Sequence, residues 1–123
     1  MSRARQSLGK WGEDLAAQYL SQAGYKILDR NVRTPYGELD LIASQGEDLV
    51  FIEVKTRAST SLGPPEISVS KAKQEHLTSA VLAYLQMHPE VHQDWRIDVI
   101  AILQLPNQSP QIEHFENIIT SNT

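Results

Sequence analysis

Cysteine is absent from the 123 residues of this chain. Its absence excludes disulfide bonds and thiolate zinc sites, and it fits a protein of the reducing cytoplasm, where we expect this one to work. The sequence also lacks an apolar run long enough to cross a bilayer, so we expect no membrane association. The first ten residues are polar and basic with no apolar segment after them, which argues against a signal peptide.

Positive charge is in the minority. The chain has 11 Lys and Arg residues against 15 Asp and Glu residues, which gives a formal net charge of −4. The distribution is uneven, because ten of the basic residues lie between Arg3 and Lys73 and only Arg96 follows them. A basic N-terminal part suits a nucleic-acid partner, but a randomly uneven surface explains the same distribution equally well.

The spacing of apolar residues predicts two helices. The first covers about residues 7–23, and the second begins after Ser70 as N-cap and ends near His88, before Pro89. Apolar residues at steps of three and four define the face that each helix is expected to bury. These predicted stripes are Leu8, Trp11, Leu15, Tyr19 and Ala23 in the first helix, and Leu77, Val81, Tyr84 and Leu85 in the second.

Five β-rich runs predict the strands of one sheet. They cover about residues 25–33, 38–43, 49–57, 95–103 and 112–119, and the second and third form a hairpin around a Gly-containing turn. Residues 58–69 contain Gly63-Pro64-Pro65 and are expected to form a loop. The order helix, three strands, helix, two strands predicts an α/β fold with a mixed central sheet of about five strands flanked by helices, in a single domain spanning residues 1–123.

The hairpin carries the residues that suggest chemistry. Side chains on a strand alternate between its two faces, so one face of the hairpin is expected to be apolar, formed by Leu39, Leu41, Ala43, Val50, Ile52 and Val54. If Ala43 faces Val50 across the turn, Asp40 lies directly opposite Glu53, and Lys55 follows two residues along the same face. Residues paired in this way have Cβ atoms about 5 Å apart.

Two carboxylates at that distance repel each other unless a cation or a shared proton neutralises them. Magnesium suits such a pair, since it accepts one or two carboxylates together with water and substrate phosphate. The alternative is a solvated polar face with a weak ion pair between Glu53 and Lys55. We favour the metal site, because Asp and Glu are poor strand formers and Asp40 and Glu53 stand among apolar residues.

Three further positions bear on the interpretation. On a helical wheel Glu13 falls beside Leu20 at the margin of the apolar stripe, where it either faces the site or is an ordinary surface glutamate, whereas Asp14 points to solvent. Asp98, in an apolar strand, is interpreted as the structural partner of a basic residue. Trp11 and Trp95 are expected in the core.

The start of the second helix is basic. Lysines there oppose the helix dipole and do not stabilise the helix, but beside exposed backbone N–H groups they can bind phosphate. The residues concerned are Lys71, Lys73 and Gln74, and a solvated helix start is the alternative.

Several of these segments together resemble the YraN family of small bacterial proteins. They are Gly9-x-x-Gly12-Glu13, Gly37-Glu38-Leu39-Asp40-Leu41-Ile42, Phe51-Ile52-Glu53-Val54-Lys55-Thr56-Arg57, Lys71-x-x-Gln74 and Arg96-Ile97-Asp98-Val99-Ile100. That family is similar to the PD-(D/E)XK nucleases, and in layout to the archaeal Holliday-junction resolvases. The resemblance implies a restriction-endonuclease-like fold in which Asp40 and Glu53 hold the metal, Glu13 supports it and Lys55 is the catalytic lysine. One departure is that leucine, not proline, precedes Asp40.

The sequence therefore predicts a nuclease that uses Mg²⁺ or Mn²⁺ to hydrolyse phosphodiester bonds, with DNA as the favoured substrate and branched or otherwise structured DNA among its candidate forms. Contacts to the nucleic acid are expected from Arg30, Arg33, Arg57, Lys71, Lys73 and Gln74. A homodimer is expected from the resemblance to resolvases. One alternative is a nucleic-acid-binding module of the same fold with little or no catalysis, and another is a structural protein whose acidic face binds cations or a protein partner.

Overall fold

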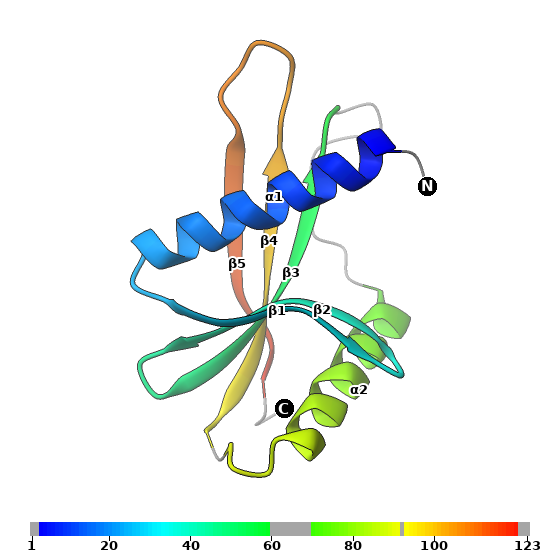
Figure 1. Cartoon of the computed structure of the whole chain (residues 1–123), viewed down its shortest axis with the longest axis vertical. Coiled ribbons are helices and arrows are strands. Elements are labelled where there is room, and N and C mark those ends of the chain that lie inside the picture. Colours follow the sequence, from blue (N-terminus) through cyan, green and yellow to red (C-terminus); the bar gives the residue numbers. More distant parts are fainter. Residues whose placement is uncertain (1–2, 60–69, 92, 121–123) are drawn as a thin grey trace.

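In the computed structural model, which describes residues 3–59, 70–91 and 93–120, five strands form one mixed sheet with a helix against each face (Figure 1). The elements are α1 (Arg3–Gln22), β1 (Lys26–Thr34), β2 (Gly37–Gln45), β3 (Asp48–Arg57), α2 (Lys71–Met87), β4 (Trp95–Leu103) and β5 (Gln111–Thr120). The strands lie in the order β1-β2-β3-β4-β5. Only β3 and β4 pair in parallel, and α2 makes the crossover between them that a parallel pair requires.

This arrangement confirms the predicted α/β fold and all seven predicted elements. Most of the predicted loop over residues 58–69 falls outside the described residues. None of the described helices is both long and apolar enough to cross a membrane.

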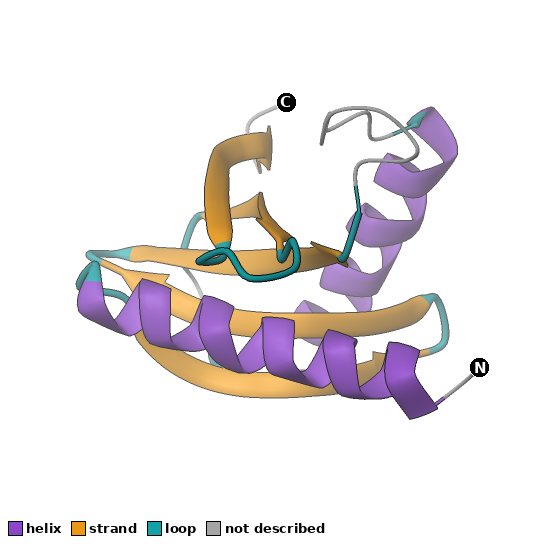
Figure 2. Cartoon of the chain, turned by 90° about the horizontal axis from the view of Figure 1, so that it is seen from above, coloured by secondary structure: helices purple, strands orange, loops and turns teal. Residues whose placement is uncertain are grey.

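The sheet lies between α1 and α2 (Figure 2), and each of its faces carries a hydrophobic core. On one face α1 covers a core that includes Leu41, Val50 and Ile52. On the other face α2 covers a core that includes Ile42 and Phe51. Successive side chains of β2 and β3 point alternately into one core and the other, so the middle of the hairpin is buried on both faces. Asp40 and Glu53 follow at one end of this apolar stretch.

The buried face of α1 differs from the predicted stripe. Gly12, Ala16 and Leu20 are its fully buried residues, whereas Trp11, expected in the core, is 36% exposed. The reason is close approach: a Cβ added at Gly12 would collide with Thr56 Oγ1 of β3. Small residues let the helix backbone lie against the sheet, and the larger side chains flank the contact. Glu13 consequently comes to the edge of the sheet-facing side.

Leu39 was expected to share a face with Leu41, and this expectation is wrong. Leu39 is buried in the core under α2, while Leu41 is buried in the core under α1. The change of side coincides with the end of regular pairing between β2 and β3, which is last seen between Leu41 and Ile52. Beyond that point β2 no longer follows the flat alternation from which the prediction was made.

The second helix follows its prediction more closely. Ser70 is its N-cap, with the hydroxyl oxygen accepting a hydrogen bond from the Lys73 N–H at 3.1 Å. Three of the four predicted stripe residues are buried, and Leu85 packs against the same core. The basic first turn of α2 is therefore fixed relative to the end of β3.

Candidate metal centre

Asp40 lies where β2 and β3 stop pairing. The observed pair Ala43–Val50 is the one predicted, but regular pairing ends at Leu41–Ile52, one residue short of Asp40 and Glu53. Beyond this pair the Val54 N–H donates a hydrogen bond to a side chain of β2, the Asp40 carboxylate, with a distance of 2.8 Å to Oδ2. The carboxylate is thus tied to the backbone of β3.

The surroundings of Asp40 disfavour its charged form. Burial raises its pKa, and the negative charge of Glu53 raises it further. The Val54 N–H works in the other direction, while Glu13 and Glu38 add to the rise, and the resulting pKa is about 7. A cation bound beside this carboxyl group would favour its charged form.

Glu13 and Glu38 complete a cluster with Asp40. One carboxylate oxygen from each of the three residues lies within 4.8 Å of the others, a spacing that would allow all three to bind one metal ion. Glu13 comes from α1, and Glu38 and Asp40 come from β2. The Asn31 side chain of β1 joins the two glutamates: its Nδ2 donates to Glu13 Oε1 at 2.8 Å and to Glu38 Oε1 at 3.0 Å.

Glu53 has a different partner. Its Oε1 lies 3.3 Å from Lys73 Nζ of α2, and the Glu53 side chain is only 14% exposed. Lys55 follows two residues later on β3, half-buried, and forms no ion pair or hydrogen bond with the residues that the structure describes. An open pocket of about 560 Å³ brings the helix and the sheet together at this place, lined by Leu8, Gly9, Glu13, Asp40, Glu53, Val54, Thr56 and Ala58.

The structure therefore brings together Glu13, Asp40 and Glu53, with Lys55 on the same strand as Glu53. Two members of the site were not identified from the sequence. Glu38 could have been, since alternation already placed it on the face of Asp40. Asn31 gave a weaker signal, an asparagine within a strand, where that residue type is uncommon.

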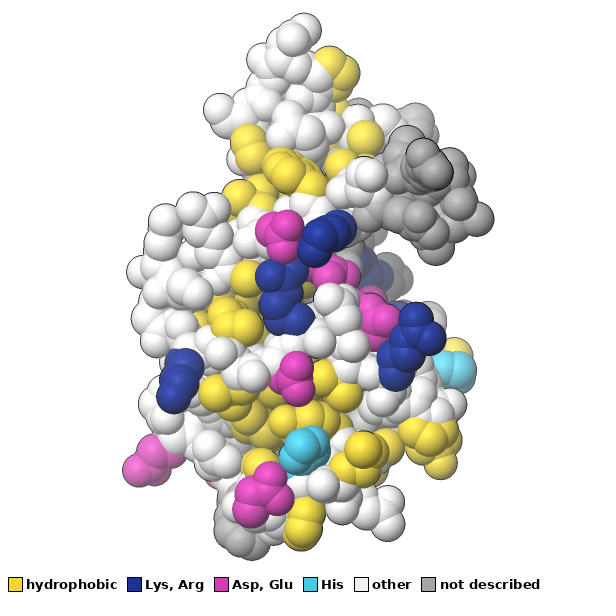
Figure 3. Space-filling model, viewed as in Figure 1, with side chains coloured by type: hydrophobic (Ala, Val, Ile, Leu, Met, Phe, Trp, Pro, Cys, Tyr) yellow, Lys and Arg dark blue, Asp and Glu magenta, His cyan; other side chains and the backbone are white. Residues whose placement is uncertain are grey.

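The residues predicted to contact nucleic acid do not gather in one patch. Arg30 pairs with Asp14 at 2.6 Å, and Arg33, whose side chain is 91% exposed, lies 4.0 Å from Glu38. Lys71 and Gln74 line a shallow pocket between α2 and the end of β5. Figure 3 shows basic and acidic side chains interleaved on the face that α1 crosses.

Arg57 lies at the end of β3, opposite Leu103 of β4, and Lys73 pairs with Glu53 as described. Two of the six predicted residues, Lys71 and Lys73, lie in the first turn of α2. Lys73 contacts the site through its ion pair with Glu53.

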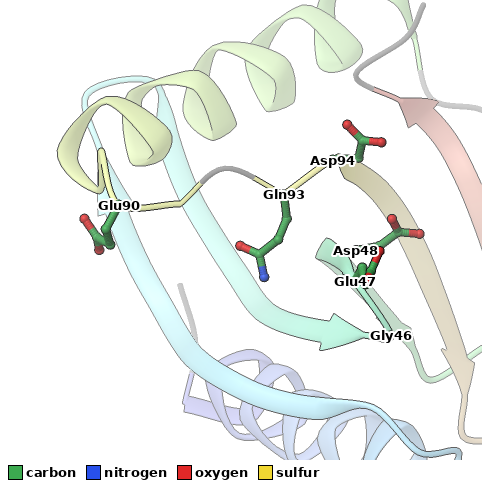
Figure 4. A pocket seen from close by; sticks show the side chains of 6 residues that line it. All are labelled: Gly46, Glu47, Asp48, Glu90, Gln93 and Asp94. Atoms are coloured by element: carbon green, nitrogen blue, oxygen red, sulfur yellow. The ribbon is translucent and has the colours of Figure 1, made fainter.

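A second acidic pocket lies at the opposite end of the hairpin, around the turn between β2 and β3 (Figure 4). It is lined by Gly46, Glu47, Asp48, Glu90, Gln93 and Asp94. Among the residues that the structure describes, no basic side chain lines this pocket, although Asp48 pairs with Arg96 at 3.4 Å. The cluster around Asp40 remains the better candidate for the predicted site.

Comparison with known proteins gives the family. Residues 12–102 match the model of "Uncharacterised protein family UPF0102". A UPF0102 protein of Syntrophomonas wolfei is 47% identical over 89% of this chain and 95% of its own length. One of Thermodesulfovibrio yellowstonii is 48% identical over 93% of this chain and 96% of its own length.

Among solved structures, a Holliday junction resolvase of Archaeoglobus fulgidus matches 89% of this chain and 87% of its own, with 20% identity and a TM-score of 0.42. This similarity is too distant to transfer an activity. The family match covers most of the chain and includes Glu13, Asp40, Glu53 and Lys55. The chain belongs to the UPF0102 family, which is the YraN family that its motifs resemble.

Proposed function

We propose that this protein is a divalent-metal-dependent nuclease, with the metal held by Asp40 together with Glu13, Glu38 and Glu53. The observation that carries the proposal is the geometry of the cluster, in which one carboxylate oxygen each from Glu13, Glu38 and Asp40 lies within 4.8 Å of the others. In agreement with it, burial and neighbouring carboxylates raise the pKa of Asp40 to about 7. A cation is the simplest partner that would relieve this repulsion. The donors are all oxygen atoms, which are the ligands that Mg²⁺ and Mn²⁺ prefer.

When bound, such a metal supplies a Lewis acid for the scissile phosphate and lowers the pKa of a coordinated water. The Val54 N–H holds Asp40 in a fixed orientation. Lys55, without an ion pair to a described residue, has a charge available to offset the negative charge that develops on the phosphate. The lysines at the start of α2 would contact the phosphate backbone.

In this proposal the fold is restriction-endonuclease-like, the nucleic acid is DNA with branched or structured forms favoured, the location is cytoplasmic and the working form is a homodimer. The alternative of a binding module without catalysis predicts the same DNA affinity with or without these carboxylates. A panel of labelled DNA and RNA structures, incubated with Mg²⁺ or Mn²⁺, separates the two, because only the nuclease shortens its substrate.

The Lys55→Met variant tests the role of the lysine. We expect at least a hundredfold loss of cleavage with metal binding retained, because the change removes charge stabilisation of the transition state and no metal ligand. Cleavage at the parent rate would remove Lys55 from the mechanism.

Glu13 and Asp14 offer a matched pair on one helix. Glu13→Gln should lower metal-dependent cleavage about tenfold or more. Asp14, which is exposed and pairs with Arg30, should tolerate Asn with almost no effect. Equal losses in the two variants would show that overall charge, not the cluster, governs activity.

A further inference from the structure

Asn31 interrupts β1 with an unusual backbone conformation. Its φ is 53°, in the left-handed region that non-glycine residues seldom adopt and that asparagine adopts more readily than most. The residue lies on β1 between Arg30 and Val32, which pair with Leu41 and Leu39 of β2. It is therefore beside Asp40, at the point where β2 changes from one core to the other.

The side-chain amide of Asn31 donates its hydrogen bonds to two carboxylates. An asparagine NH₂ group has two hydrogens to donate, and here the Nδ2 atom donates to Glu13 Oε1 at 2.8 Å and to Glu38 Oε1 at 3.0 Å. Glu13 is on a helix and Glu38 is on a strand, so no backbone ladder would otherwise fix the distance between them. The amide links these two elements at the cluster.

The chemical nature of the link also matters. A lysine or arginine at this position would hold the same two carboxylates but would cancel their charge and compete with a cation. The neutral amide orders them without cancelling their charge, and each glutamate keeps a second oxygen outside these two hydrogen bonds. Groups that orient metal ligands in this way typically contribute 10–100-fold to metal affinity or activity.

We propose that Asn31 is the positioning residue of the metal centre, holding Glu13 and Glu38 at the separation at which they and Asp40 bind one divalent cation. This inference rests on the proposed function and goes beyond it by assigning a role to a residue that binds neither metal nor substrate. The left-handed backbone explains why asparagine suits the position, since it is the common residue that accepts this conformation and also carries two donors.

The test uses two substitutions that keep the backbone conformation accessible. Asn31→Gly removes the amide, and we expect the Mn²⁺ affinity measured by calorimetry to fall about tenfold or more. Asn31→Asp replaces the donors with another negative charge. The melting temperature of Asn31→Asp in chelator should be lower than that of the parent, because a further negative charge then faces Glu13 and Glu38.

Asn107 supplies the control, because it has a φ of 59° in the exposed turn between β4 and β5. Asn107→Gly should leave the Mn²⁺ affinity unchanged. A positioning role also requires that saturating Mn²⁺ restore much of the cleavage rate of Asn31→Gly, whereas loss of a metal ligand is not rescued in this way.

The outcomes separate this inference from the proposed function. If the parent and Asn31→Gly bind Mn²⁺ equally well, Asn31 serves the backbone alone and the inference is overturned, whether or not the protein cuts DNA. If affinity falls in Asn31→Gly and no variant cuts any substrate, the positioning role stands and the nuclease proposal fails. A parent protein that binds no Mn²⁺ overturns both.

Discussion

Two aspartates of the same sheet occupy opposite electrostatic environments. Asp98 on β4 is fully buried, and its carboxylate accepts hydrogen bonds from several donors. It accepts hydrogen bonds from Arg96 Nε at 3.0 Å, His114 Nε2 at 2.8 Å and the Asn117 N–H at 2.8 Å. Burial alone would raise the pKa of Asp98, but these donors outweigh it and hold the pKa below its usual value.

Asp40 on β2 is less buried and has fewer donors. The Val54 N–H is the hydrogen bond that lowers its pKa, while the neighbouring charges of Glu53, Glu13 and Glu38 are all negative. Its pKa rises to about 7, so burial and charge act in the same direction. The donors around Asp98 satisfy its carboxylate, whereas Glu53, Glu13 and Glu38 surround the Asp40 carboxylate with negative charge, which is the pattern that the proposed metal site requires.

The largest effect expected from this comparison of Asp98 with Asp40 is the loss of stability on replacing Asp98. Asp98→Ala should lower the free energy of unfolding by about 3–5 kcal/mol, because the largely buried Arg96 keeps the longer 3.4 Å contact to the half-exposed Asp48 but loses Asp98, and His114 loses its acceptor. Urea denaturation at neutral pH measures the effect. Since the folded-state pKa is lowered, the contribution of Asp98 is present above about pH 4 and is lost as the pH falls below that value.

Asp98→Asn provides the control for volume, because it keeps the size of the side chain and loses the charge. It should lie between the parent and Asp98→Ala in stability. A loss below about 1 kcal/mol in Asp98→Ala would mean that the network contributes no more than an ordinary hydrogen bond.

At Asp40 we expect the opposite effect: removing the charge should stabilise the folded protein at neutral and higher pH. The folded-state pKa of about 7 lies above the ordinary value of 3.8, so the stability that Asp40 contributes is full below about pH 4 and is lost as the pH rises towards 7. Asp40→Asn removes this loss and can still accept the Val54 N–H. In chelator at pH 8 the variant should be more stable by about 2 kcal/mol, roughly half of what the full shift would give, because Asp40 retains some solvent contact.

Thermal or urea unfolding between pH 4 and pH 8 checks this prediction, with the difference growing up to about pH 7 and then levelling off. Saturating Mn²⁺ should reverse the order by stabilising the parent alone. A variant that is less stable than the parent at pH 8 in chelator would show that Asp40 is a structural residue, as Asp98 is.

The sequence was sufficient for the features that depend on local rules. The turn length set the register of β2 against β3, so the pair Ala43–Val50 was predicted correctly, and Asp40 and Glu53 line one pocket just beyond the last regular pair. Ser70 was recognisable as an N-cap because capping involves a few adjacent residues. Asp98 was correctly expected to pair with a basic residue, since a buried carboxylate in an apolar strand requires a donor.

The remaining features depend on contacts between distant segments. The packing face of α1 was misjudged because Gly12 and Ala16 allow close approach to the sheet, and large apolar residues dominate any sequence pattern. Leu39 was placed on the wrong side because β2 departs from flat alternation where its pairing with β3 ends. Asn31 could not be recognised because its role needs Glu13 and Glu38 beside it, from two other elements.

The smallest expected effect concerns Lys73, the one lysine among the described residues that already lies beside the cluster. Its Nζ is 3.3 Å from Glu53 Oε1, so it supplies some of the positive charge that the cluster lacks. A cation that binds near Glu53 must therefore compete with Lys73 or displace it. Because the lysine side chain is 45% exposed, this pair is expected to contribute only about 0.2–1 kcal/mol.

Lys73→Met should consequently tighten Mn²⁺ binding by about 1.4- to fivefold, the range that corresponds to such an ion pair. The gain should shrink at high salt, where exposed ion pairs are screened. Lys71→Met is the matched control, since Lys71 is in the same first turn, is exposed and pairs with no acidic group among the described residues. An equal gain in both variants would indicate a general effect of net charge, whereas a gain in Lys73→Met alone would show that Glu53 belongs to the metal centre and that the protein holds it with its own cation until a metal arrives.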